Sequence, residues 1–429
     1  MFIRSIPASL LATLALLACS GSNKPPAAEQ TLNIYTWADY IAPDTVANFE
    51  HETGIKVRYT TFDTNEVLAT QLLTGHTNYD IVVPSDFYFA RLMKAGAFRK
   101  LDKAALPNSA NLDPDIMQKL AVHDPGNQYS VPYLWSTTGL GYNIDKVRER
   151  LGTAEFDSWS LLLDPRNAAK LQDCGIQIID SATDVLTSVL IYLGKDPNSR
   201  EPADLEAAAD ALMKIRPFVR SIDAVATIGD LANGTVCLIL TWSGDVTEAR
   251  YRAIEASNGV KIRYFVPREG GLIAADMLSI PADAPHPQNA EKWLNYLMLP
   301  KVMASITNTT KYPNGNRASL AFVQDALKND PTIYPGPEIR AKLHVLPETA
   351  SEHASEDGGD AGRLLNAVAD TFAEDGFQTA YAWALADDGP RIEFLSAAGW
   401  GLDGTRSNLD MGVKVPVVRL HTRIGSAGG

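Results

Sequence analysis

Near its N-terminus the chain reads Leu32-Asn33-Ile34-Tyr35-Thr36-Trp37-Ala38-Asp39-Tyr40, and we expect the fold to be organised around this run. Its alternation and its β-branched and aromatic residues predict a β-strand. An indole, a carboxylate and a phenol follow at the carboxyl end, where open α/β sheets bind their ligands. A carboxylate between aromatic faces suits an organic cation. The alternative is a surface strand end whose aromatic rings only cap the core.

Length and composition bound the class of protein. The chain has 429 residues, which predicts two or three domains. Its 45% hydrophobic and 21% charged residues are typical of a globular protein with a core. A formal net charge of −13 argues against nucleic acid and anionic lipid as partners and favours cations.

Residues 1–19 predict export. Arg4 precedes an apolar stretch, Leu10 to Leu17, that is too short to span a bilayer. Leu16-Leu17-Ala18-Cys19 resembles a bacterial lipobox, which implies cleavage before Cys19 and acylation of its thiol. The alternative is a plain secretory signal with an incidental cysteine. With a lipobox, residues 20–30 form a flexible tether between the lipid and the folded chain.

Two cysteines remain once Cys19 is assigned to the lipid. Cys174 and Cys237 form an even pair in an oxidising compartment, which favours a disulfide. The alternative is two buried free thiols, because the sequence does not give the geometry that a disulfide requires.

The first part of the chain alternates strands and helices. After the first strand we predict a helix from about Pro43 to Gly54, a strand at 55–60, a helix at 66–73 capped by Asn65, and a strand at 79–83. Strands joined in this way imply right-handed crossovers and a parallel sheet. The strand ends at Trp37 and Ser85 then open on the same side of the sheet.

The middle of the chain predicts a second sheet and a crossing segment. Residues 129–143 are extended without helical period, and they are long enough to cross between two lobes. A helix is predicted from Asp184 to Leu193. An apolar strand at 236–241 ends in Trp242-Ser243-Gly244-Asp245, which repeats the indole and carboxylate of the first strand. Two such strand ends suggest two walls of one cleft.

A single acid stands inside a later apolar strand. Asp276 lies in the run Leu272 to Ile280, where an unpaired carboxylate would cost several kcal/mol. Its partner is either a bound ammonium group or a Lys or Arg of the protein. Tyr312 follows in a turn that presents another phenol.

The sequence carries none of the common catalytic motifs. It has no Gly-x-Ser-x-Gly elbow, His-Glu-x-x-His helix, Walker loop or Cys-x-x-Cys pair, so we predict a protein that is not an enzyme. Gly139-Leu140-Gly141 lacks the rest of a dinucleotide fingerprint, and we interpret it as a close approach of backbone to the sheet. The seven histidines lack metal-ligand spacing, so we predict no cofactor and no metal. As an alternative, clustered carboxylates could hold Ca²⁺ or act as acid and base.

Five stretches carry a family resemblance: Ile34 to Pro43, Tyr79 to Ser85, Thr137 to Asn143, Tyr192 to Ser199, and Trp242 to Val246. They resemble the bacterial polyamine-binding proteins of ABC importers, most closely the putrescine-binding branch. The likeness is collinear over roughly residues 31 to 346. It implies a two-lobe periplasmic-binding-protein fold (type II) of the α/β class. Each lobe is a mostly parallel sheet flanked by helices, and a hinge between the lobes lets them close on a ligand.

The resemblance also implies the boundaries and the function. Lobe 1 comprises residues 31–136 and 268–315, and lobe 2 comprises residues 137–267 and 316–346. The expected protein is a monomeric, membrane-anchored lipoprotein of the periplasm. It binds putrescine or a related polyamine and delivers it to an ABC permease in the inner membrane, and it has no nucleic-acid partner. The alternatives are polyamine sensing without transport and binding of another organic cation.

Site residues carry over from the family by position. One wall holds Trp37, Asp39, Tyr40 and Ser85, the other holds Asp184, Trp242 and Asp245, and Asp276 and Tyr312 lie at the back. Carboxylates bind the ammonium ends of a diamine, and aromatic faces pack against its methylene groups. The family also supports a disulfide between Cys174 and Cys237.

Two site positions depart from the family pattern. Ala274 stands where the family usually has an aromatic residue, which widens the ligand box, and Asp184 stands where relatives often have Glu. Both departures favour a site that tolerates spermidine or a related amine better than a tight putrescine box does.

The likeness ends after residue 346. The family closes with a basic segment that is missing here, and residues 347–429 match nothing known to us. A frame change in the coding sequence and a genuine appended segment both explain this. The composition predicts disorder at 348–361 and one amphipathic helix that includes Leu364, Leu365, Val368 and Phe372.

Overall fold

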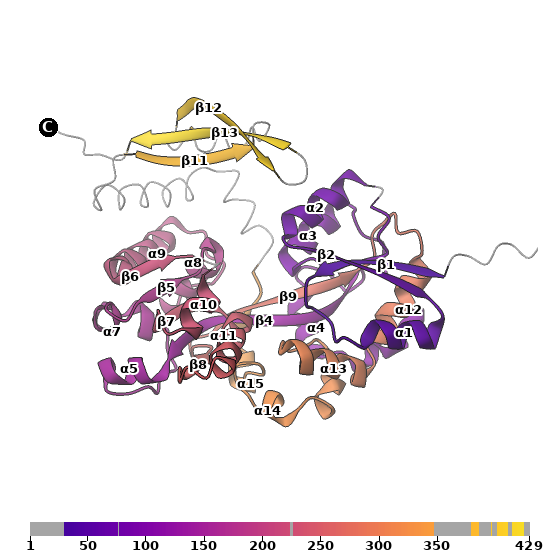
Figure 1. Cartoon of the computed structure of the whole chain (residues 1–429), viewed down its shortest axis with the longest axis horizontal. Coiled ribbons are helices and arrows are strands. Elements are labelled where there is room, and N and C mark those ends of the chain that lie inside the picture. The colour runs from indigo at the N-terminus through magenta and orange to yellow at the C-terminus, as the bar shows by residue number, and fades with distance from the viewer. Residues whose placement is uncertain are drawn as a thin grey trace, which may run out of the picture.

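The computed structural model describes residues 30–75, 77–223, 226–346, 379–385, 396, 401–410 and 414–423. Two lobes lie side by side, and two long strands, β4 (Ser130–Asn143) and β9 (Gly271–Ser279), run between them (Figure 1). The two-lobe α/β fold expected from the sequence is confirmed. The predicted signal peptide and lipobox Cys19 lie outside the described residues, as does the predicted tether apart from Gln30.

The first lobe is built on three parallel strands. Their order is β2 (Lys56–Phe62), β1 (Thr31–Trp37) and β3 (Ile81–Val82). The helices between and after them are α1 (Thr45–Thr53), α2 (Asn65–Thr74), α3 (Asp86–Lys94) and α4 (Pro114–Leu120), with short 3₁₀ turns η1 (Lys103–Ala105) and η2 (Pro107–Asn111). The predicted strand–helix alternation is confirmed.

One predicted helix cap is wrong. Thr64, not Asn65, caps α2, because the Thr64 hydroxyl accepts a hydrogen bond from the backbone N–H of Val67. Thr64 is extended, as an N-cap residue requires, whereas Asn65 is already the first helical residue. The side chain of Asn65 is therefore available for another role.

The crossing strands join both lobes into one sheet. Strand β9 pairs with β3 and β4, and β4 continues into the second lobe, where it pairs with β7 (Leu238–Trp242) and β8 (Ile262–Phe265). Gly139 and Gly141 lie in this part of β4. A Cβ atom on Gly139 would stand 2.5 Å from the carbonyl oxygen of Phe265, and one on Gly141 would stand 2.6 Å from a methyl group of Val246. The interpretation of these glycines as a close backbone approach is confirmed.

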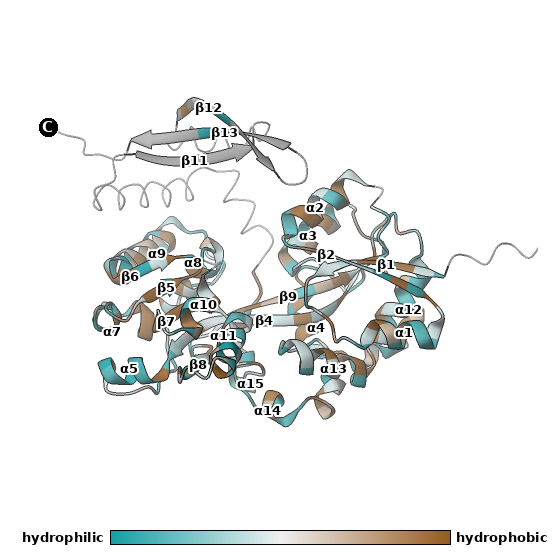
Figure 2. Ribbon diagram, viewed as in Figure 1, coloured by the Kyte–Doolittle hydropathy of each residue, from teal (hydrophilic) through white to brown (hydrophobic). Residues whose placement is uncertain are grey.

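The second lobe repeats the first in outline. Strands β7, β5 (Ile176–Ile178) and β6 (Val219–Ile222) are parallel. Around them lie α5 (Ile144–Leu151), α6 (Ser160–Leu163), α7 (Pro165–Leu171), α8 (Ala182–Tyr192), α9 (Pro202–Ile215), η3 (Arg216–Phe218), α10 (Thr227–Ala232) and α11 (Ser243–Glu255). Hydrophobic residues follow the strands inside each lobe, while helices such as α5 are largely hydrophilic (Figure 2).

The last part of the two-lobe body contacts both lobes. It comprises α12 (Pro287–Leu297), α13 (Pro300–Thr310), η4 (Arg317–Ala321), α14 (Asp325–Lys328), α15 (Pro337–Arg340) and β10 (Leu343–His344). Arg340 forms an ion pair with Asp113 of the first lobe, whereas Asp330 forms one with Arg250 of the second. The lobe boundaries stay a prediction, since the assignment of 316–346 to lobe 2 accounts for only part of these contacts.

A second, separate sheet forms near the C-terminus. Strands β11 (Thr379–Leu385), β13 (Lys414–Arg423) and β12 (Gly401–Asp410) are antiparallel in this order. The sequence did not predict these strands, because Pro416 lies in the central strand, where proline is unfavourable. The predicted disorder at 348–361 and the predicted helix around Leu364 to Phe372 lie outside the described residues.

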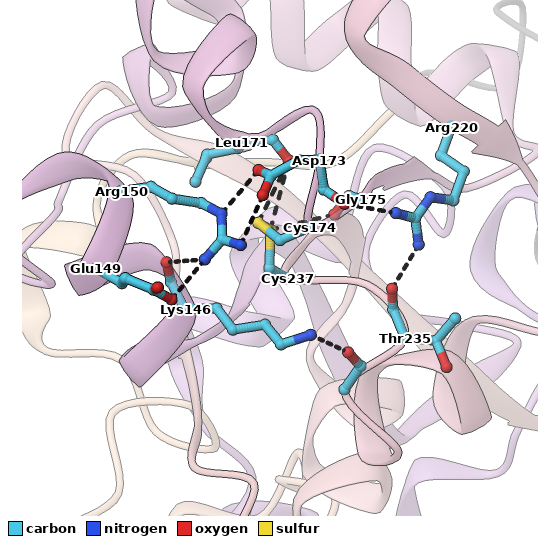
Figure 3. Close-up of polar contacts among 11 residues, drawn as sticks. Lys146, Glu149, Arg150, Leu171, Asp173, Cys174, Gly175, Arg220, Thr235 and Cys237 are labelled. Carbon is cyan, nitrogen blue, oxygen red and sulfur yellow. Dashed lines mark hydrogen bonds and ion pairs between the residues drawn. A yellow bond between two sulfur atoms is a disulfide. The ribbon is translucent and has the colours of Figure 1, made fainter.

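The disulfide between Cys174 and Cys237 is present, and a guanidinium group reinforces it (Figure 3). Arg220 donates hydrogen bonds to the carbonyl oxygens of Asp173, which precedes Cys174, and of Thr235, two residues before Cys237. The covalent bond and Arg220 thus hold the same two backbone segments together. None of the helices in the described part of the chain has the length and apolarity needed to cross a bilayer.

We predict that the double variant Cys174→Ser/Cys237→Ser stays folded but loses roughly 2–4 kcal/mol in the free energy of unfolding, because a loop of 63 residues is no longer closed. Urea denaturation measures the loss. Arg220→Gln should cost more in the Ser/Ser background than in the wild type, since the disulfide no longer holds the same two backbone segments together. An unchanged denaturation midpoint in the Ser/Ser variant would contradict this account.

Candidate ligand-binding site

Asp276 is the centre of the first wall. It lies on β9 and forms a bridge with Ser85, which follows β3. The Ser85 hydroxyl donates to one carboxylate oxygen of Asp276 at 2.9 Å, and the Tyr40 phenol donates to the other at 2.5 Å. Each oxygen of Asp276 thus accepts one hydrogen bond from a neutral group.

The pKa of Asp276 is raised to about 6. Burial is the main cause, and hydrogen bonds from Tyr40 and Ser85 partly oppose it. Asp276 keeps some accessible surface although protein atoms enclose it closely. Among the ion pairs of the described residues, none joins Asp276 to a Lys or Arg. Of the two partners weighed from the sequence, the described residues thus supply no protein cation to Asp276.

The second wall contributes two more carboxylates, each in the first turn of a helix. Asp184 on α8 accepts hydrogen bonds from Thr138 and Ser181, both at 2.6 Å, and from the indole of Trp242 at 3.3 Å. Asp245 on α11 accepts one from Thr241 at 2.7 Å. The positive end of each helix dipole favours a negative charge there. We call Asp184, Asp245 and Asp276 the carboxylate cluster.

The pKa of Asp245 is also raised to about 6, again because of burial, while the hydrogen bond from Thr241 lowers it. The two carboxyl groups come from different lobes. Because both pKa values are about 6, the two carboxyl groups change protonation in the same pH range.

Tyr312 connects the two walls. Its ring lies edge-on to that of Tyr40 at 5.7 Å between centroids. Its phenol lies against Gly244, at the start of α11, where a Cβ atom would collide with it. Burial raises the pKa of Tyr312, and the charges of Asp245 and Asp276 raise it further, so the phenol is close to both carboxylates. Gly244 is needed to let the lobes meet at this point.

Two predicted site residues, Asp39 and Trp37, form no described hydrogen bond with the carboxylate cluster. Asp39 is exposed and adopts a left-handed backbone conformation with φ of 53°, and no hydrogen bond or ion pair joins its side chain to the carboxylate cluster among the described contacts. Trp37 donates its indole N–H to the carbonyl oxygen of Val83 and packs against Phe62. The nearby indole also lowers the pKa of Asp276, so Trp37 borders the cluster. Contact of any of these residues with a ligand stays a prediction.

Sequence reasoning missed the groups that hold the carboxylates. They are the small polar side chains of Asn65, Thr138, Ser181 and Thr241. Thr241 and Ser181 stand within four residues of a predicted acid, which is a weak signal. Thr138 and Asn65 come from other elements, and only the sheet register and the loop paths bring them close.

Ala274 lies on the same face of β9 as Asp276, because side chains two residues apart share a face. Its partner on β4 is Ser136, and both are half-buried. Two small side chains therefore stand beside Asp276. Within the described residues, no group of three or more His, Cys, Asp or Glu side chains is arranged to hold a metal ion.

Comparison with known proteins gives consistent matches. Residues 44–335 match the bacterial extracellular solute-binding protein family. The putrescine-binding periplasmic protein SpuD of Pseudomonas aeruginosa is 45% identical over 341 residues, which are 79% of this chain and 91% of SpuD. The putrescine-binding periplasmic protein PotF of Escherichia coli is 48% identical over 323 residues, 75% of this chain and 87% of PotF.

A solved structure agrees with these relatives. The spermidine/putrescine ABC transporter substrate-binding protein PotD of Streptococcus pneumoniae has a TM-score of 0.67 to this chain at 30% identity. The match covers 74% of this chain and 93% of PotD.

We predict that Asp245→Asn stabilises the ligand-free protein above pH 6. A carboxyl group with a pKa of about 6 when folded and about 4 when unfolded stabilises the fold below pH 4, and this contribution is lost as the pH rises through 6. The variant should therefore be more stable by roughly 1–3 kcal/mol at pH 7.5 and equal to the wild type near pH 4. Urea denaturation between pH 4 and 8 measures this.

Asp173→Asn is the matched control with the opposite sign. Arg150 lowers the pKa of Asp173 to about 2, so its carboxylate stabilises the fold above pH 4, and its loss should destabilise at pH 7.5. If Asp245→Asn were no more stable than the wild type at any pH, burial of the ionised Asp245 carboxylate would not destabilise the fold.

Proposed function

The chain belongs to the bacterial extracellular solute-binding protein family, and from this premise we propose that it captures putrescine or a related polyamine and passes it to an ABC importer. The observation that carries the proposal is the carboxylate cluster. Its acids come from both lobes and are held by hydroxyl, phenol and indole groups. A bound cation would compensate the negative charge of these carboxylates.

A linear diamine fits the chemistry of the site. Each ammonium group has three donors, and the carboxylates accept them as charge-assisted hydrogen bonds. The aromatic rings of Tyr40, Tyr312 and Trp242 offer faces for the methylene groups and attract positive charge. Asp39, which is exposed, would reach the ligand only if its loop moved on binding.

The relatives support import and a location in the periplasm. SpuD and PotF are named as putrescine-binding periplasmic proteins, and PotD as the substrate-binding protein of an ABC transporter. We propose that this chain is a monomeric binding protein, tethered to the membrane by a lipid on Cys19.

Labelling with radioactive palmitate tests the anchor, and Cys19→Ser should abolish the label.

Two alternatives have specific tests. A polyamine sensor would have the same site, and deletion of the gene would then change signalling without changing polyamine uptake. Enzymatic activity would convert the amine into a product, whereas a binding protein releases it unchanged. SpuD and PotF are named as binding proteins and PotD as the substrate-binding protein of an ABC transporter, which favours binding over catalysis.

Calorimetric titration with putrescine, cadaverine and spermidine is the direct test. We expect putrescine to bind and spermidine to bind within about a hundredfold of it, because Ala274 and Ser136 leave room beside Asp276. Asp245→Asn should weaken binding by about 2 kcal/mol or more, since it removes one charge partner. Asp173→Asn, next to the distant disulfide, is the control and should bind as the wild type does. The proposed function fails if none of the three amines binds.

Contacts of α11 with the segment after α13 suggest how the site closes. Arg250 of α11 forms an ion pair with Asp330, and the two side chains are only 26% and 16% exposed. Next to this pair the ammonium of Lys311 lies 5.6 Å from the ring centroid of Tyr251. Both contacts join α11 to the segment after α13. We propose that they stabilise the closed, ligand-bound arrangement of the lobes.

We predict that Arg250→Gln weakens putrescine binding by roughly threefold to tenfold, mainly through faster dissociation, because it removes an ion pair that on this proposal stabilises the closed state. Arg252→Gln is the matched control on the same helix, since Arg252 pairs with Glu248 of α11 itself. Stopped-flow fluorescence measures the dissociation rate. Equal rates for both variants would show that the ion pair of Arg250 does not stabilise the closed state.

A further inference from the structure

Asn65 is linked to the carboxylate cluster through Ser85. The backbone N–H of Ser85 donates to the side-chain oxygen of Asn65 at 3.0 Å. A backbone N–H can only donate, so this atom of the amide must be the oxygen. The other end of the amide is then the NH₂ group, and it donates to the Ser85 hydroxyl at 3.1 Å.

The direction of the next hydrogen bond follows from this. The Ser85 hydroxyl has one proton, and its oxygen already accepts from Asn65. The hydroxyl proton therefore points to Asp276, whose oxygen lies 2.9 Å away. The chain of donors runs in one direction, from Asn65 to Ser85 to Asp276. Without Asn65 the hydroxyl could rotate and leave Asp276 with one donor fewer.

Among the described hydrogen bonds, the side chain of Asn65 contacts Ser85 alone. It is the first residue of α2, and that helix is already capped by Thr64. Its side chain instead connects the start of α2 to the segment between β3 and α3 and, through Ser85, to β9.

From this geometry we propose that Asn65 is a positioning residue, which orients the Ser85 hydroxyl toward Asp276 and so keeps Asp276 ionised to receive an ammonium group. This inference rests on the proposed polyamine function. The lost interaction is a hydrogen bond to a charged group, and its loss costs more because protein atoms closely enclose Asp276.

Several titratable groups face Asp276 and share its pH range or influence its charge. They are Tyr40, Tyr133 and Tyr312, and the acid Asp86 at the start of α3, while Asp245 from the other lobe acts on the same phenol of Tyr312. His123 stands behind Asp86 at 3.4 Å. Substitution of Asn65 leaves all of these in place, so a change in pH dependence relative to the wild type reports on Asp276.

The experiment is calorimetric titration with putrescine from pH 5 to pH 8.5 for the wild type, Asn65→Ala and Asn65→Asp. Both variants should bind roughly tenfold or more weakly at pH 7, because a hydrogen bond to a charged group is lost. Affinity should recover toward the wild-type value at pH 8.5, where Asp276 is ionised again. The midpoint of the pH dependence should therefore move upward, and further for Asn65→Asp, whose carboxylate draws the Ser85 proton away and adds a like charge.

Asn48→Asp is the matched control, because Asn48 is exposed on α1 and its amide contacts only Asp44 among the described hydrogen bonds. It should bind as the wild type does at every pH. Weakening without a shift in the midpoint would mean a merely structural role and would overturn the inference, as would wild-type binding by both Asn65 variants. Absence of binding by the wild type itself would refute the proposed function instead.

Discussion

The structure depends on the cost of enclosing carboxylates without a protein cation beside them. Removing a carboxylate from water is expensive, and a Lys or Arg partner would repay part of that cost within the fold. Among the described residues, Asp276 and Asp245 accept hydrogen bonds from neutral donors alone, and their pKa values rise to about 6. The protein thus tolerates two charges that are poorly compensated at neutral pH. A site of this kind is completed by a cation from outside.

The fold provides this arrangement through the strands that join its lobes. Strand β9 carries Ala274 and Asp276, and β4 carries Ser136 and Thr138, so the joining strands also form the floor of the site. The sequence predicted the crossing run at 129–143 and its tight glycines, because long extended runs and Gly residues have clear local signatures. It did not predict the C-terminal sheet, and Pro416 in the central strand argues against a strand there, because proline cannot donate to the ladder of hydrogen bonds.

The sequence predicted the acids of the site but not the groups that donate hydrogen bonds to them or orient those donors, and this difference has a physical reason. Asp276 was identifiable because an acid in an apolar strand needs a compensating partner. The groups that supply compensation, such as Asn65 and Thr138, were not identifiable, because polar residues of this kind also occur as caps and in solvated strands. Asn65 itself was predicted to cap a helix, and only the extended backbone of Thr64 shows which of the two neighbours does so. The exposed position of Asp39 likewise depends on a left-handed turn that no neighbouring residue signals.

The same electrostatic cost can couple ligand binding to closure. Bringing the lobes together removes more water from carboxylates on both walls, which is unfavourable when no cation is between them. In the proposed mechanism, contacts such as Arg250 with Asp330 and Tyr312 against Gly244 favour closure, and the cost of enclosing the carboxylates opposes it. A bound ammonium group reverses the balance, because each carboxylate then gains a charged partner in a water-poor site. We therefore propose that closure follows the cation, because a ligand that binds the closed arrangement more tightly shifts the equilibrium toward it.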